Sequence, residues 1–172
     1  MIRETENIER MVTALADRTT LYLASHMAID VTDVENAGQG LDALTLEHLT
    51  AVVGVGGPSG VLVAFSYSPG LADALFQHTA DALGFSEDEG DVLRDACLSE
   101  IANVITGNWI ADFAPPGERI SMTPPVVLEG ARHIHHVPDA TFRSITTVTK
   151  EGPLSIYLIG PQNMFDQFLD AK

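Results

Sequence analysis

Two apolar runs separated by a short glycine-rich segment most constrain what this chain can fold into. Residues 49–55 and 61–67 are rich in valine and other apolar side chains, and the run Gly-Gly-Pro-Ser-Gly occupies positions 56–60 between them. β-Branched and apolar side chains favour strands, whereas glycine and proline favour a tight turn. The pattern therefore predicts a β-hairpin, and the chain should contain antiparallel pairing.

The order of the other segments predicts a mixed fold. A helix is expected over residues 5–24, a second from Pro69 to about Leu83, and a third that begins after Ser86 and ends near Ala111. Proline suits a first helical turn, and serine followed by acids suits an N-cap. Further strands are expected at 26–31, 119–123, 126–129, 133–137, 142–149 and 154–159, with a last short helix from Pro161. This order indicates an α+β domain, in which a mostly antiparallel sheet packs with two long helices.

The two halves of the chain also show a weak internal sequence similarity. A shift of 92 positions sets Gly60 on Gly152, Leu62 on Leu154 and Pro69 on Pro161, and it lays the first predicted helix on residues 97–116. Few residues are identical, so chance similarity is an alternative. The matching order of elements favours an ancient duplication with a pseudo-twofold arrangement. We therefore expect one domain, residues 1–172, built from two pseudo-repeats at about 1–92 and 93–172.

Charge and composition exclude several classes of function. The 172 residues include 9 Lys and Arg against 24 Asp and Glu, which gives a formal net charge of −15. Nucleic acids and anionic membranes both require clustered positive charge, so neither is expected as a partner. No stretch approaches the roughly 20 apolar residues of a spanning helix, and the N-terminus lacks an apolar signal core. One cysteine, Cys97, allows no internal disulfide. We expect a soluble cytoplasmic protein.

One predicted helix combines the side chains that could perform chemistry. At about 100° per residue, one apolar stripe of this helix contains Leu93, Cys97, Leu98, Ile101, Val104 and Ile105. A narrower sector beside the stripe holds Ala96, Glu100, Asn103 and Gly107. An acid and an amide thus lie between two residues small enough to let a partner approach the backbone. On composition alone, an ordinary solvated helix face is the favoured interpretation.

With the residues that follow it, this segment resembles the CheC/CheX/FliY chemotaxis phosphatases. The family pattern is Asp or Ser, Glu four residues later, Asn three further, and Pro about 22 residues beyond. Glu100 and Asn103 match the acid and the amide, and Pro124-Pro125 follows at about the right distance. The chain looks closest to CheX, because it has one copy of the motif whereas CheC has two.

Two positions depart from the family pattern. Ala96 stands where the family has Asp or Ser, and Pro125 follows Asn103 with 21 residues between, one fewer than in the pattern. The intact acid–amide pair favours an active phosphatase. Ala96 favours the alternative, a non-catalytic CheX-like module that binds a receiver or another signalling partner.

The resemblance implies a reaction and a partner. In the family the pair enters the active site of a phosphorylated response regulator, CheY, whose receiver supplies Mg²⁺ and a lysine. Asn103 would then orient the water that attacks the aspartyl phosphate, and Glu100 would pair with the receiver lysine. The chain would need no cofactor of its own. Likeness to CheX also implies a homodimer, joined through sheet edges or adjoining loops.

The 92-residue shift further predicts that only the second half holds a site. It places Ile8 and Met11 of the first helix on Glu100 and Asn103. Apolar side chains cannot orient a water molecule, so these two residues are expected to belong to the core or to an interface.

Other candidates for chemistry favour structural interpretations. His133, His135 and His136 suggest a metal site, but only the first two share a face of the predicted strand and no further ligands are evident. A surface strand is the favoured interpretation there. Cys97 belongs to the apolar stripe and is expected to be a small buried side chain rather than a nucleophile.

Overall fold

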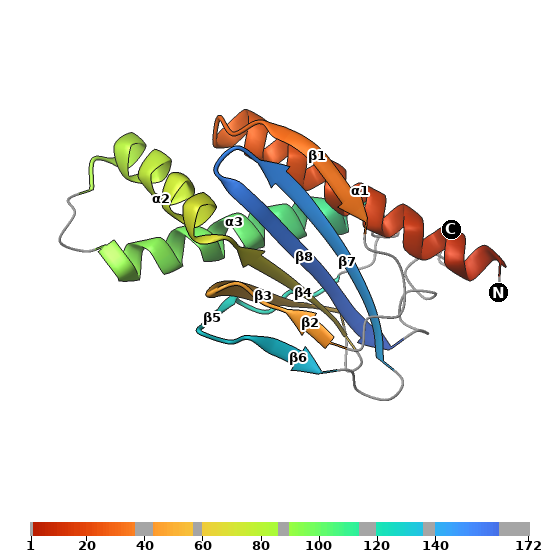
Figure 1. Cartoon of the computed structure of the whole chain (residues 1–172). Helices are drawn as coiled ribbons and strands as arrows, with labels where there is room; N and C mark the ends of the chain where they lie inside the picture. Colours follow the sequence, from red (N-terminus) through yellow and green to blue (C-terminus); the bar gives the residue numbers. More distant parts are fainter. Residues whose placement is uncertain are drawn as a thin grey trace.

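A six-stranded sheet forms the centre of the molecule (Figure 1). The computed structural model describes residues 2–36, 43–56, 60–85, 90–113, 120–135 and 140–161, with side chains throughout except at 2–8, 43 and 113. The strands of this sheet are β1 (Val31–Asn36), β3 (Leu49–Val55), β4 (Val61–Tyr67), β5 (Val126–Glu129), β7 (Ala140–Thr149) and β8 (Gly152–Pro161), in the spatial order β1-β7-β8-β4-β3-β5. A separate two-stranded sheet pairs β2 (Ala43–Thr45) with β6 (His133–His135). Every pairing between the described strands is antiparallel.

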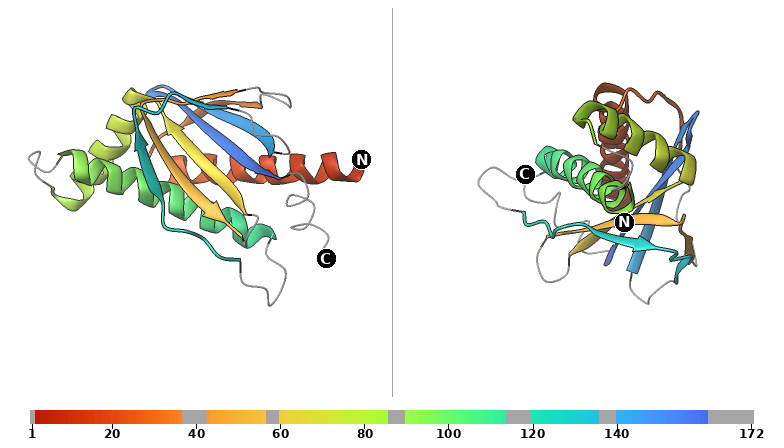
Figure 2. Two further views of the ribbon diagram at one scale, coloured as in Figure 1. Left: turned by 90° about the horizontal axis from the view of Figure 1, so that it is seen from below. Right: turned by 90° about the vertical axis from the view of Figure 1, so that its left-hand side faces the viewer.

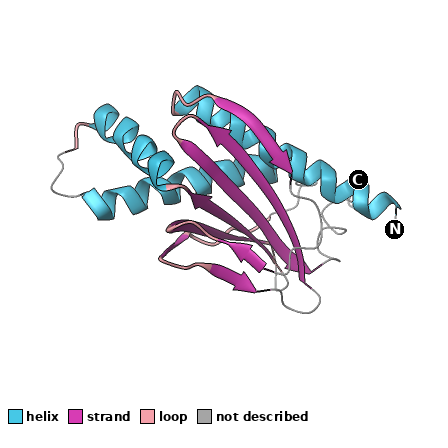
Figure 3. Cartoon of the chain, in the orientation of Figure 1, coloured by secondary structure: helices cyan, strands magenta, loops and turns pink. Residues whose placement is uncertain are grey.

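Helices cover one face of the large sheet, as Figures 2 and 3 show. In the described part of the chain they are α1 (Ile2–His26), α2 (Pro69–Leu83) and α3 (Gly90–Phe113). The long helices α1 and α3 pack side by side and run in opposite directions (Figure 1). The predicted α+β class is confirmed. None of the described helices has the length and apolarity needed to cross a membrane.

The hairpin predicted from the two apolar runs forms as expected. Strands β3 and β4 pair in register from Leu49–Tyr67 to Val55–Val61, and Gly56 enters the turn with a φ of 101°, a value that favours glycine. The next helix, α2, has Pro69 in its first turn. It ends at Gly84, whose left-handed backbone lets its N–H donate to the Ala80 carbonyl at 2.8 Å.

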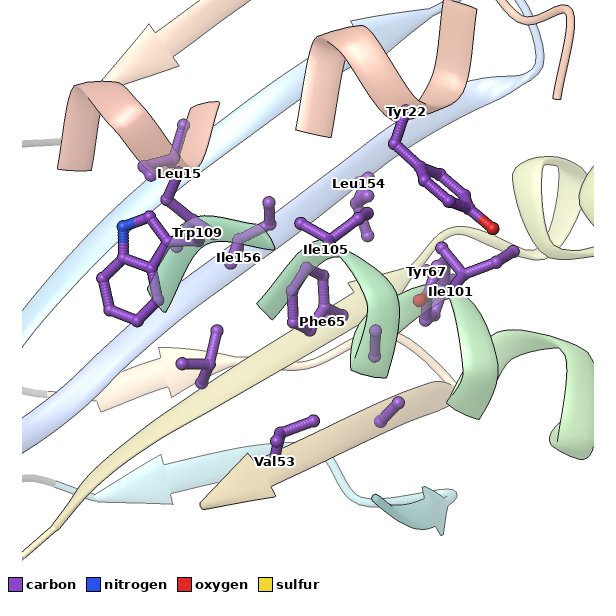
Figure 4. Packing of buried hydrophobic residues seen from close by; sticks show 14 of the residues in the cluster. Leu15, Tyr22, Val53, Phe65, Tyr67, Ile101, Ile105, Trp109, Leu154 and Ile156 are labelled. Carbon is purple, nitrogen blue, oxygen red and sulfur yellow. The ribbon is translucent and has the colours of Figure 1, made fainter. Parts of the chain in front are cut away.

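The main core lies between the sheet and the three helices (Figure 4). Alternate residues of β4 and β8 face the helices and are fully buried, among them Val63, Phe65 and Ile156. From α3, Trp109 enters this core beside Leu15 of α1. A smaller cluster on the other face of the sheet packs β2 and β6 onto β7 and β8.

Two predicted strands are wrong. Residues 26–31 are no strand, because α1 continues to His26, whose ring stacks on Tyr22 with centroids 4.8 Å apart, and β1 begins only at Val31. Within 119–123, the described residues form a single bridge, Val55 with Met122. Prolines 124 and 125 follow at once, and they have no N–H to extend a ladder. The predicted N-cap at Ser86 and the helix beyond Pro161 lie outside the described residues, and Pro161 itself ends β8.

The strand order of the large sheet reads the same from either edge when β1 is equated with β5, β3 with β7, and β4 with β8. However, the 92-residue shift does not hold for β4 and β8. It equates Leu62 with Leu154, yet Leu62 is 44% exposed and Leu154 is fully buried. A slip of one residue moves a strand's side chains to the opposite face, so these strands correspond at a spacing of 93. The duplication itself stays a prediction.

Candidate functional site

Helix α3 buries a broad face against α1, α2 and the sheet. Its buried residues are Cys97, Leu98, Ile101, Ala102, Ile105, Thr106, Trp109 and Ile110. The predicted apolar stripe is therefore right at four positions, whereas Leu93 and Val104 are only half-buried. Ala102 and Thr106 extend the buried face because one is small and the other donates its hydroxyl to the Ala102 carbonyl at 2.7 Å.

The opposite side of α3 faces outward and contains the predicted acid–amide pair. Five residues lie within about 80° of one another around the helix at 100° per residue. We call them the outer face of α3: Val92, Ala96, Glu100, Asn103 and Gly107. The first three are exposed, and Asn103 and Gly107 are half-buried. The structure thus brings together the four residues of the predicted sector and adds Val92.

Polar contacts from three elements hold α3 in place. The buried Tyr67 hydroxyl of β4 donates to the Leu98 carbonyl at 3.0 Å, and the Trp109 indole N–H donates to the Met11 carbonyl of α1 at 2.9 Å. From α2, the Thr79 hydroxyl lies 3.1 Å from the Cys97 sulfur. The outer face therefore belongs to a helix that is fixed on its other sides.

The outer face has a free acid and a free amide. Among the described residues, neither the Glu100 carboxylate nor the Asn103 carboxamide has a side-chain hydrogen bond or an ion pair. The nearby cation Arg94 is engaged by Asp91 at 3.4 Å and faces Asp95 at 4.0 Å. Beneath this region burial raises the pKa of Tyr22, and the charges of Cys97 and Glu100 raise it further. Tyr22 is therefore a neutral neighbour of Glu100 at physiological pH.

The segment that leads to Pro125 lies beside the C-terminal half of α3. Met122 faces Gly107, since a Cβ built on that glycine would lie 3.8 Å from the Met122 sulfur. Thr123 fixes this segment to β3 by two hydrogen bonds with the Gly54 backbone, both 2.9 Å long. The room at Gly107 shows that packing within the chain does not require a glycine there. Pro125 is half-buried at the start of β5.

The hollows formed by described residues lie away from the pair. Two surface hollows are lined by described residues, one beside Thr13 and Asp112 and one beside His48 and Arg132, and neither includes Glu100 or Asn103. An exposed acid and a half-buried amide on the outward side of a helix are open to a partner that approaches from outside. Such a face can enter a hollow on another macromolecule.

The other predicted candidates lie elsewhere. His133 and His135 share a face of β6, as predicted, with ring centroids 6.4 Å apart, and His136 lies outside the described residues. Within the described ranges no three His, Cys, Asp or Glu side chains are grouped to hold a metal ion. Cys97 is 9% exposed and burial raises the pKa of its thiol, which agrees with the predicted small buried side chain.

Met11 lies in the core, which is one of the two positions predicted for it, the other being an interface. It is 1% exposed, whereas Asn103, its counterpart under the 92-residue shift, lies on the outer face of α3. The two residues therefore face different ways on their helices. The side chain of Ile8 lies outside the described part of the chain.

Sequence reasoning missed Val92. This side chain is 79% exposed, the largest value among the exposed large apolar residues of the described chain. The sequence does indicate that Val92 shares a helix face with the acid, because Val92, Ala96 and Glu100 follow one another at four-residue intervals.

Comparison with protein families gives a match over the central part of the chain. Residues 49–148 match the family described as "Chemotaxis phosphatase CheX". This range includes the whole of α3 and the segment containing Pro125. No protein of curated function matches the chain at a significant level.

Solved structures share the fold at low sequence identity. A chemotaxis protein CheX from Desulfovibrio desulfuricans is 20% identical, with a TM-score of 0.67 over 87% of this chain and 97% of the other. A CheX from Borrelia burgdorferi, in a complex with CheY, BeF₃ and Mg²⁺, is 17% identical, with a TM-score of 0.60 over 87% and 96%. FliY from Thermotoga maritima is 12% identical, with a TM-score of 0.64 over 100% and 98%.

Proposed function

Because the chain belongs to the CheX family of chemotaxis phosphatases, we propose that it hydrolyses the aspartyl phosphate of a CheY-like response regulator. The similar Borrelia burgdorferi CheX forms a complex with CheY, which supports a receiver of that type as the partner. The observation that supports this function best is the position of Glu100 and Asn103. Both side chains lie on the outward side of a firmly held helix, without partners in the described chain.

Asn103 is the proposed water-positioning residue. Its carboxamide has a carbonyl oxygen that accepts and an amino group that donates hydrogen bonds, so it can hold a water molecule in one orientation. That water attacks phosphorus in line with the bond to the receiver aspartate. The new P–O bond forms as the old one breaks, the aspartate leaves as a carboxylate, one proton of the water stays on the phosphate, and the other is released to solvent.

Glu100 is the proposed docking residue. It precedes Asn103 by three residues and lies on the same face of α3, so both can enter one hollow. A carboxylate without a partner in its own chain can pair with the receiver lysine at little internal cost. In the proposed reaction Mg²⁺ is held by the receiver, and this chain uses no cofactor of its own.

The decay of a phosphorylated receiver tests the proposal. CheY-type receivers from the same organism are phosphorylated with acetyl phosphate, and dephosphorylation is followed with wild type, Asn103→Ala and Glu100→Ala. Asn103→Ala should lower kcat by about 10²–10³-fold, the range typical for one positioned polar group, with KM little changed. Glu100→Ala should raise KM as well, because the ion pair forms on docking.

One control and two possible outcomes make the result decisive. Both variants should keep the stability of wild type, since neither side chain belongs to the buried face of α3. Equal acceleration by all three proteins would overturn the proposed roles of Asn103 and Glu100. Binding to the phosphorylated receiver without acceleration by wild type would instead favour the non-catalytic module, with Ala96 as the position that departs from the active pattern.

We also propose a cytoplasmic homodimer joined through the sheet edges. The edge strands β1 and β5 each expose apolar side chains, Val34 at 42% and Val126 at 58%. Unpaired edge strands can pair with another chain. Light scattering at micromolar concentration should give twice the mass of one chain, and a monomer would contradict the dimer.

A further inference from the structure

Val92 is an exposed apolar side chain with no role in folding. It lies in the first turn of α3 and is 79% exposed, so it contributes almost nothing to the core. Single exposed apolar residues are ordinary on protein surfaces. The significance of Val92 is its position, on the outer face that also holds Glu100 and Asn103.

Distance places Val92 inside the area that a docked receiver would cover. It precedes Glu100 by eight residues and Asn103 by eleven, so at 1.5 Å per residue it lies about 14 Å along the helix from the midpoint of the pair. A typical interface buries about 800 Å² on each partner, equivalent to a disc of about 16 Å radius. A receiver of that size centred on Glu100 and Asn103 therefore reaches Val92 near the edge of its footprint.

This end of the outer face holds an apolar pair, Val92 and Ala96, flanked by the carboxylates of Asp91, 91% exposed, and Asp95, 38% exposed. Val92 and Ala96 are both exposed, and Glu100 is the only charged residue among the five. The chain as a whole has a net charge of −15, so long-range attraction would favour only basic partners. A short-range apolar contact provides affinity that does not depend on charge or on salt.

We infer that Val92, with Ala96 beside it, is a specificity-determining contact for an apolar side chain of the phosphorylated receiver. This inference rests on the proposed function and identifies which receivers the site accepts. A receiver with an apolar side chain opposite Val92 buries it, whereas one with a charged side chain there must desolvate that charge without a partner.

The test compares Val92→Thr and Val92→Ile with wild type, using the CheY-type receiver that wild type dephosphorylates fastest. Threonine keeps the branched shape but adds a hydroxyl to the contact, and isoleucine keeps an apolar surface. Val92→Thr should raise KM about fivefold to tenfold with kcat unchanged, as expected for loss of one buried aliphatic contact. Val92→Ile should retain the wild-type KM within about twofold.

Salt dependence and a matched surface variant separate this contact from a structural effect. The KM ratio of Val92→Thr to wild type should be the same at low and high salt, whereas the ratio for Glu100→Gln should shrink as salt rises. Leu62→Thr changes another exposed apolar residue, 44% exposed on the sheet face away from the helices, and should leave KM unchanged.

Several outcomes would overturn the inference. If Val92→Thr keeps the wild-type KM while wild type is active, Val92 makes no contact with the receiver, although the proposed function stands. If Val92→Thr alters self-association instead of KM, the surface contacts a second copy of the chain. If wild type accelerates no receiver, the proposed function fails and the inference fails with it.

Discussion

The two long helices pack against each other and on the same sheet face, yet their outward sides differ. The outward side of α1 exposes Arg10, Thr13 and Asp17 together with one large apolar residue, Leu21, which is 56% exposed. The outward side of α3 exposes small and apolar residues around one acid and one amide. Both helices bury a face of similar kind, so the fold alone does not distinguish them. Among the described side chains of the two helices, only α3 places an acid and an amide together on its outward side, and the proposed function depends on that pair.

The largest expected loss of stability comes from a polar substitution on the buried side of α1. Met11→Gln places an amide in the core and should lower the free energy of unfolding by about 2–5 kcal/mol, as core truncations and unpaired polar groups do. Urea denaturation measures this loss. The matched variant Thr13→Gln lies on the exposed side of α1 and should change stability by less than about 0.5 kcal/mol. If Met11→Gln instead folds normally and alters only turnover, α1 belongs to the site and the contrast between the helices fails.

A substitution with a smaller expected effect tests the role of the outer face of α3. Gly107→Ala should raise the free energy of unfolding by about 0.5–1 kcal/mol, because alanine favours helix and the new Cβ has room beside Met122. The same methyl group lies on the proposed docking surface and should raise KM for the phosphorylated receiver. Higher stability with unchanged KM would show that the partner does not approach this end of α3. As a contrast, Gly70→Ala should destabilise, since its Cβ would strike the Glu151 carbonyl oxygen.

The smallest effect concerns the link between the two helices. The Arg18 guanidinium donates to both carboxylate oxygens of Asp112, one bond being 2.8 Å long, and this holds the pKa of Asp112 below its usual 3.8. The pair is partly exposed, so Asp112→Asn should cost only about 0.2–1 kcal/mol near neutral pH. A depressed pKa means that this contribution is present above 3.8 and is lost as pH falls through the lower folded-state value. Denaturation of both proteins across this range should show the difference vanish in acid, and a difference that persists would contradict the ion pair.

Local signals explain which elements the sequence predicted well. The bounds of β3, β4 and α2 match the predicted residues, because glycine at the turn and proline in the first helical turn act within a few residues. β1 was missed, since its polar, exposed side chains form a strand only by pairing with β7, more than 100 residues later in the chain. A pattern within residues 31–36 cannot identify β7 as the pairing strand.

The candidate site was predicted in part for a similar reason. Helical spacing and family resemblance located Glu100 and Asn103, and the structure places both on the outward side of α3. The spacing did not show how far the buried face extends, because Ala102 and Thr106 lack the apolar size that marks a core position. The proposed role of Val92 rests on its exposure in the folded chain, which helical spacing alone does not give.

The contact between Trp109 and Met11 gives the protein an internal spectroscopic reporter. Trp109 is the sole tryptophan of the chain, is 1% exposed, and its indole N–H bonds the α1 backbone. Its emission should therefore be blue-shifted while α1 and α3 are joined and should move to longer wavelengths when they separate. In the proposed complex the receiver covers the other side of α3, so this signal should change little on binding. One fluorescence spectrum can thus distinguish a variant that has lost its partner from one that has lost its fold.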